Sequence, residues 1–71
     1  MEVLVFKTDV RNRKRMSALA PHLENMKGIL KWNIDLQDID KVLRIESASI
    51  SASTIEKSLR RAGYYCEELT G

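Results

Sequence analysis

Apolar and polar residues alternate most strictly between Leu30 and Leu36. The apolar positions are Leu30, Trp32, Ile34 and Leu36, and the polar positions between them are Lys31, Asn33 and Asp35. Successive side chains of a strand point to opposite faces, so this period of two predicts a strand with one buried face. Its polar face should meet solvent.

Three other segments have strand character. Val3–Phe6 is a short run of β-branched, aliphatic and aromatic residues, and Val42–Glu46 follows a turn-like segment at Gln37–Asp40. The strand at Val42–Glu46 should therefore form an antiparallel hairpin with the strand at Leu30–Leu36. Tyr64–Leu69 has the aromatic content of a last short strand.

A different period indicates a helix after the first strand. Its apolar positions recur every three or four residues, at Met16, Leu19, Ala20, Leu23 and Met26. Asp9 or Asn12 would cap its start, and Gly28 would end it. Pro21 lies inside this helix and has no N–H to donate to the carbonyl of Ser17, so it should distort the helix there.

A second helix is predicted after the hairpin. Ser51 or Ser53 can cap its start, and the segment Ser53–Glu56 fits a capping box. One face would then carry Ile55, Leu59 and Ala62. Gly63 should end the helix, because glycine tolerates the left-handed backbone found there.

The elements follow the order βαββαβ, the split βαβ or ferredoxin-like arrangement of an α+β protein. We therefore expect a two-layer sandwich of a four-stranded antiparallel sheet, in the order 4-1-3-2, with both helices on one face. The edges of this sheet would be Leu30–Leu36 and Tyr64–Leu69. A chain of 71 residues buries only about 60% of its unfolded surface, so we expect residues 1–71 to form a single domain.

Composition and charge narrow the class of protein. Apolar residues make up 44% and charged residues 31% of the chain, which is typical of a folded globular protein. No apolar run approaches the roughly 20 residues that span a bilayer, and no basic leader precedes Val3–Phe6, so we expect a cytoplasmic protein without a membrane segment. Cys66 is the lone cysteine and excludes an intrachain disulfide.

Several short motifs resemble those of the heavy-metal-associated domain, the fold of small copper chaperones and of the N-terminal modules of metal-pumping ATPases. Gly28-Ile29 is similar to the Gly-Val before the second strand of that family, and Ile34-Asp35-Leu36 to its Val-Asn/Asp-Leu. Ser51 resembles the cap of its second helix, and Ala62-Gly63-Tyr64 its Ala-Gly-Tyr. The resemblance covers most of the chain and implies the same ferredoxin-like fold.

The resemblance places the family's metal loop, M-x-C-x-x-C, over Val10–Arg15. Both cysteines are absent, since Asn12 and Arg15 stand at the two ligand positions. Arginine does not lose its proton in proteins, and soft metals such as Cu(I) require thiolate or imidazole donors. We therefore expect neither a metal site nor a cofactor.

Other donors do not restore a metal site. His22 is expected on the surface of the first helix, away from Cys66, which we interpret as a buried core thiol. Asp35, Asp38 and Asp40 lack the glycine and the terminal glutamate of a calcium loop, so a solvated turn is expected there. The alternative function is a copper or zinc carrier related to metallochaperones, with atypical ligands or with Cys66 shared between two copies.

Charge is concentrated in one segment, which we call the basic loop: Arg11, Asn12, Arg13, Lys14 and Arg15. These residues would lie at a helix N-terminus, where the helix dipole favours anions and disfavours cations. We therefore predict that the basic loop binds an acidic protein surface or, as a second choice, a small phosphate-containing anion. The alternative is a solvated loop that serves solubility alone.

Other function classes are less well supported. No strand carries the paired exposed aromatics of an RNA-binding sheet, so nucleic acid is not expected as a partner. The chain has no nucleophile with an evident base and no glycine-rich phosphate loop, so we expect no enzymatic activity. Exposed strand edges permit self-pairing, so a monomer or a weak homodimer is expected. A non-enzymatic interaction module is the best general interpretation.

Overall fold

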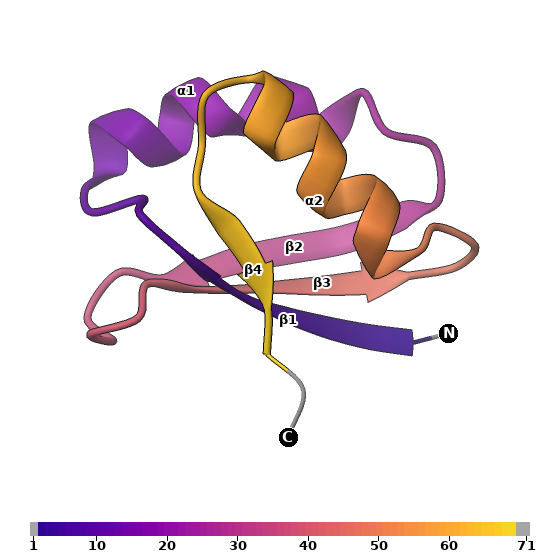
Figure 1. Ribbon diagram of the computed structural model, residues 1–71, viewed down its shortest axis with the longest axis horizontal. Coiled ribbons are helices and arrows are strands. Elements are labelled where there is room, and N and C mark those ends of the chain that lie inside the picture. The colour runs from indigo at the N-terminus through magenta and orange to yellow at the C-terminus, as the bar shows by residue number, and fades with distance from the viewer. Residues whose placement is uncertain (1, 70–71) are drawn as a thin grey trace.

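A computed structural model describes residues 2–69, which form a four-stranded sheet and two helices that cover one of its faces (Figure 1). The elements are β1 (Glu2–Thr8), α1 (Arg13–Glu24), β2 (Ile29–Asp35), β3 (Val42–Ser47), α2 (Ala52–Arg61) and β4 (Cys66–Glu68). Neighbouring strands are antiparallel and follow the order β2-β3-β1-β4, which is the predicted order 4-1-3-2 read from the other edge. The ferredoxin-like fold is therefore confirmed.

The core lies between the sheet and the two helices. Each central strand contributes alternate side chains to it, and each helix contributes the buried stripe that its sequence pattern predicts. The buried core residues are Leu4, Phe6, Val10, Leu19, Leu23, Leu43, Ile45, Ile55, Leu59 and Cys66. Trp32 and Tyr64 are half-buried against this core. Burial of these apolar side chains is the main favourable contribution to stability.

The predicted buried face of β2 is wrong at one residue, Leu30. A β-bulge between Ile29 and Lys31 shifts the pairing of β2 with β3 by one residue. Ile29 consequently packs against the core in place of Leu30, which is 61% exposed. From Trp32 onward the predicted alternation holds.

The end of α1 also differs from the prediction. The helix ends at Glu24, and Asn25 caps it by donating its N–H to the carbonyl of Pro21 at 3.1 Å. Gly28 therefore does not end the helix; it has a φ of +97° in the turn that precedes β2. A Cβ atom at Gly28 would lie 2.9 Å from Ser49 Oγ, so close approach of the backbone explains the glycine.

At the start of α2, Ser51 is the cap and the predicted box at Ser53–Glu56 does not form. The Ser51 side chain accepts from the N–H of Thr54 at 3.2 Å. The carboxylate of Glu56 instead accepts from the N–H of Glu68, at 2.6 Å, and so joins α2 to β4. Glu56 therefore acts between elements and has no part in capping its own helix.

Gly63 ends α2 as predicted. Its φ is +94°, and its N–H donates to the carbonyl of Arg60 at 3.0 Å. The N–H of Tyr64 donates to the carbonyl of Leu59 at 2.9 Å, so the two bonds complete a Schellman motif. This motif turns the chain sharply toward β4.

The last strand is shorter than predicted. Within residues 2–69, β4 spans Cys66–Glu68, with Cys66 opposite Thr8, and Leu69 donates its N–H to the carbonyl of Val5 at 2.8 Å. Tyr64 and Tyr65 belong to the connection from α2. That connection consequently lies beside the end of β1 and the start of the basic loop.

The turn between β2 and β3 lies at Gln37–Asp40, as predicted. Asp35 accepts from the N–H of Gln37 at 3.0 Å, and Asp38 accepts from the N–H of Asp40 at 2.8 Å. Asp40 forms an ion pair with Lys7 at 3.6 Å. These carboxylates thus stabilise a turn.

No helix within residues 2–69 has the length and apolar character needed to cross a membrane.

Candidate functional site

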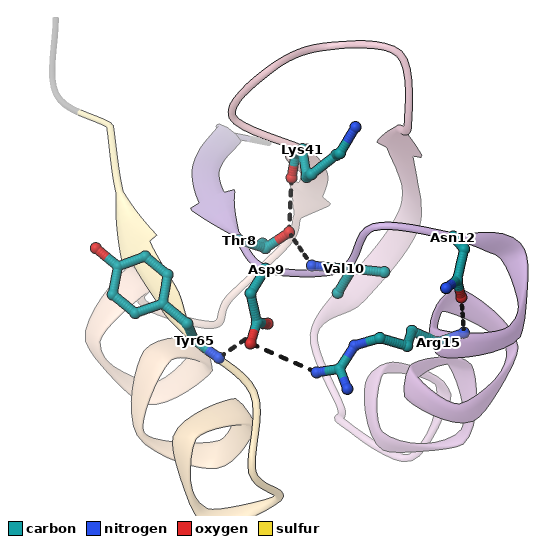
Figure 2. Close-up of polar contacts among 7 residues, drawn as sticks. All are labelled: Thr8, Asp9, Val10, Asn12, Arg15, Lys41 and Tyr65. Atoms are coloured by element: carbon teal, nitrogen blue, oxygen red, sulfur yellow. Dashed lines mark hydrogen bonds and ion pairs between the residues drawn. The ribbon is translucent and has the colours of Figure 1, made fainter.

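The connection from β1 to α1 is anchored to the rest of the fold just before the basic loop. Val10 is fully buried in the core. The Thr8 hydroxyl donates to the carbonyl of Lys41 at 2.7 Å and accepts from the N–H of Val10 at 3.2 Å (Figure 2). The N–H of Thr8 donates to the carbonyl of Asp40 at 3.1 Å. These contacts hold the start of the connection against the β2–β3 turn.

Asn12 is the N-cap of α1. Its backbone is extended, and its side-chain oxygen accepts from the N–H of Arg15 at 2.8 Å (Figure 2). This confirms Asn12, of the two candidates, as the cap. Asn12 stands at the first metal-ligand position of the family that the sequence resembles, and here its one side-chain acceptor oxygen stabilises the helix.

Arg15 turns toward the connection between α2 and β4. One of its guanidinium nitrogens, Nη2, lies 3.4 Å from Oδ2 of Asp9, and its guanidinium carbon lies 5.3 Å from the centroid of the Tyr64 ring. The other oxygen of Asp9 accepts from the N–H of Tyr65 at 3.2 Å (Figure 2). The side chain of Arg15 therefore has an ion-pair partner and an aromatic contact, which sets it apart from the other cations of the basic loop.

The remaining cations, Arg11, Arg13 and Lys14, are exposed. None of these three forms an ion pair with another residue of the range 2–69. Arg13 and Lys14 are the first two residues of α1, whose first turn contains no acidic residue. The helix dipole and the side chains thus place positive charge at the same end of the molecule.

The geometry of the basic loop does not fit a metal ion. The side-chain oxygen of Asn12 is a helix cap, and the guanidinium of Arg15 has no lone pair to donate. Across residues 2–69, no three His, Cys, Asp or Glu side chains are grouped so that they could hold a metal. The residues present therefore cannot form the thiolate site of the heavy-metal-associated family that the sequence resembles.

The thiol of Cys66 and the imidazole of His22 lie in different environments, one buried beside the end of β1 and the other exposed on α1. Cys66 is fully buried, as predicted, and burial, with a smaller contribution from the charge of Glu56, raises the pKa of its thiol to about 12. His22 is exposed on α1, as predicted. Its ring meets the ring of Tyr64 edge-on, with the two ring centroids 6.0 Å apart. A metal shared between two copies of Cys66 would require a thiol at the surface.

The sequence did not indicate that Asp9, Tyr64 and Tyr65 meet the basic loop. The sequence indicates Asp9 only as a helix cap, and Tyr64 only as the start of the last strand and as part of the Ala-Gly-Tyr motif. The antiparallel pairing of β1 with β4 places Tyr65 directly beyond Cys66 and therefore beside Asp9. The strand topology could have indicated these contacts, since in this fold the last strand begins where the first strand ends.

The fold resembles that of a solved structure. The chain is similar to the yeast copper-transporter domain Ccc2a, whose solution structure was determined in the apo and Cu(I)-loaded states. The TM-score is 0.83, with 17% sequence identity over 99% of this chain and 97% of that domain. This likeness confirms the expected heavy-metal-associated type of fold, and at this identity it concerns the fold alone. No protein-family model and no curated protein sequence matches the chain.

Proposed function

We propose that this chain, with the fold of a copper-transporter domain and no thiolate in the corresponding loop, is a non-enzymatic interaction module that binds an acidic surface of a partner protein. The observation that carries this proposal is the group of exposed cations Arg11, Arg13 and Lys14, which have no ion-pair partner within residues 2–69. A cytoplasmic location is part of the same proposal.

Electrostatics at the start of α1 supports an anionic partner. A cation in the first turn of a helix is unfavourable by roughly 0.3 to 1 kcal/mol at low ionic strength. Arg13 and Lys14 both occupy that turn without a neighbouring acid. Carboxylates of a partner would relieve this repulsion and would also bind near the free N–H groups of the helix end.

The contacts of Arg15 weigh against a metal ion at this position. Its guanidinium is a permanent cation next to Asp9 and Tyr64, so a second cation at this position would be repelled. Burial of Cys66 weighs against the alternative of a copper or zinc carrier that shares this thiol between two copies. We therefore favour a docking surface over metal transport.

The test is an NMR titration of the whole chain with a short poly-glutamate peptide at low and high salt. Amide shifts are expected to centre on Arg11 to Arg15 and to weaken with salt, since exposed charges are screened. A variant with Arg11, Arg13 and Lys14 changed to glutamine should lose binding. The matched control changes three other exposed cations, Lys27, Lys57 and Arg61, to glutamine and should retain it.

Three results would contradict the proposal. Equal loss of binding in both triple variants would mean that net charge alone attracts the peptide. Binding of a short polyphosphate without binding of poly-glutamate would indicate a small-anion site. Stoichiometric binding of Cu(I) under reducing conditions would indicate a metal carrier with an unforeseen ligand set.

A further inference from the structure

Beyond this proposed function, the open edge of the sheet at β2 carries a pattern of its own. β2 lies at the end of the sheet, and no strand of residues 2–69 pairs with its outer side. An edge strand leaves alternate backbone N–H and C=O groups unpaired, which makes it a template for another strand. β2 has seven residues, whereas the opposite edge strand, β4, has three.

Side chains on the two faces of β2 have different characters. Lys31, Asn33 and Asp35 are exposed on the face that no helix covers. Trp32 and Ile34 are half-buried on the helix side and pack against the core. One oxygen of Asp35 accepts from the N–H of Gln37, which leaves its other oxygen for an external partner. The edge therefore presents a cation, Lys31, two residues before Asn33, and an anion, Asp35, two residues after it.

We infer that β2 pairs antiparallel with β2 of a second copy of this chain, with Asn33 opposite Asn33. A two-fold axis at Asn33 places Lys31 of each copy opposite Asp35 of the other, so two opposite-charge pairs form on one face. On the other face, Trp32 of each copy lies opposite Ile34 of the other. Directly opposed pairs of both kinds stabilise antiparallel strands.

Other registers lack this match. An axis at Lys31 or at Asp35 would place like charges directly opposite, which destabilises the pairing. An axis at Trp32 or at Ile34 would place each charged residue opposite an uncharged one. The β-bulge lies between Ile29 and Lys31, so the segment Lys31–Asp35 remains regular. Asn33 is thus the centre at which the edge is complementary to itself.

The molecular surface beside β2 can receive apolar side chains of the second copy. A hollow of about 360 Å³ lies between the end of α1 and the edge strand. Its lining residues are Leu23, Glu24, Ile29, Leu30, Lys31 and Trp32. Leu30 lines this hollow and is 61% exposed, so its side chain is available for apolar contact with the second copy. Apolar burial there adds to the strand pairing.

The opposite edge does not offer the same possibility. β4 is short, and its sequence includes the adjacent acids Glu67 and Glu68. Pairing of two copies at β4 would bring carboxylates together. A single strand pair is a small interface, so the β2 dimer should be weak, with a dissociation constant of about 0.1 to 1 mM.

The test is sedimentation of the whole chain over concentrations up to about 1 mM, with charge-reversed variants. Lys31→Asp should weaken dimerisation about 10-fold or more, because both opposite-charge pairs become like-charge pairs. Asp35→Lys should do the same, and Asp35→Asn, which keeps an acceptor for the N–H of Gln37, should weaken it less. Lys57→Asp, the same charge change at an exposed residue of α2, should leave it unchanged.

The decisive sample is an equimolar mixture of the Lys31→Asp and Asp35→Lys variants. Each variant alone repels itself, but between the two every pair at positions 31 and 35 is of opposite charge. Recovery of dimers in the mixture would support the inferred register. A monomeric wild type throughout the concentration range, undiminished dimers in the folded single variants, or no recovery in the mixture would each overturn it.

Discussion

Arg15 lies over the ring of Tyr64, with its guanidinium carbon 5.3 Å from the ring centroid. Arg15 is in the first turn of α1, and Tyr64 follows the end of α2. The contact therefore joins the starting end of one helix to the finishing end of the other. Asp9, which pairs with Arg15 and accepts from the backbone of Tyr65, reinforces the same junction.

Replacement of Arg15 by alanine should destabilise the fold. The cation–π contact and the half-exposed ion pair with Asp9 together contribute about 0.5 to 1.5 kcal/mol. Urea unfolding followed by circular dichroism would measure the change. Arg13→Ala is the matched control, because Arg13 is exposed and has no ion pair within residues 2–69; it should alter stability by less than about 0.5 kcal/mol. Equal effects of the two substitutions would contradict a structural role for Arg15.

Asn12 gives a prediction in two directions. Asn12→Ala removes the acceptor for the N–H of Arg15 and should lower the free energy of unfolding by about 1 kcal/mol. Asn12→Asp keeps the acceptor and adds negative charge beside Arg13 and Lys14, so it should raise that free energy by about 0.3 to 1 kcal/mol at low salt. Thermal unfolding at two salt concentrations checks both. A gain from Asn12→Asp that persists at high salt would rule out the electrostatic explanation.

Pro21 is expected to weaken α1. It lies within the helix, three residues before the end at Glu24, and cannot donate to the carbonyl of Ser17. Pro21→Ala should restore this bond and raise the free energy of unfolding by about 1 to 3 kcal/mol. Ala18→Gly, at another exposed position of α1, should lower it by about 1 kcal/mol. A loss of stability in Pro21→Ala would show that the proline ring itself contributes needed packing.

The buried thiol predicts a dependence of stability on alkaline pH. Because burial raises the pKa of Cys66 from 9.0 to about 12, the folded state holds its proton more tightly than the unfolded state. The stabilisation by the neutral thiol is complete below pH 9.0 and is lost as pH rises toward about 12. Comparing urea unfolding of wild type and Cys66→Ala across this range isolates the thiol from other titrating groups.

The same thiol should resist alkylation. At neutral pH, iodoacetamide should modify Cys66 only when the chain unfolds, since the reactive species is an exposed thiolate. Mass spectrometry with and without urea measures this. Rapid modification of the folded protein would contradict the burial of Cys66.

The alternation of β2 shows both the strength and the limit of the sequence. Trp32 and Ile34 face the core as the period of two predicts, but Leu30 does not. The bulge that turns Leu30 outward arises from the pairing of Ile29 with Ser47 and of Lys31 with Glu46, which involves a strand elsewhere in the chain. A local pattern contains no information on such a shift in register.

The contacts of the basic loop could be predicted from the sequence only where they are local. Asn12 is a local cap, three residues from its partner, and its role follows from the residue type. The bond between Asp9 and Tyr65 spans 56 residues of sequence, so the two-sided contacts of Asp9 depend on how β4 meets β1. Residue type alone therefore groups Arg15 with the exposed cations, although Arg15 contacts Asp9 and Tyr64.

The buried side chain of Val10 and the hydrogen bonds of Thr8 affect how tightly the neighbouring loop can bind. They fix the chain just before the basic loop, and the Asn12 cap fixes it just after Arg11. Most of the backbone ordering there is thus completed when the protein folds, so a partner meets a preorganised arrangement of charge. Binding then loses less conformational entropy than it would on a flexible basic tail, and the spacing of acidic groups on the partner becomes a basis for selectivity.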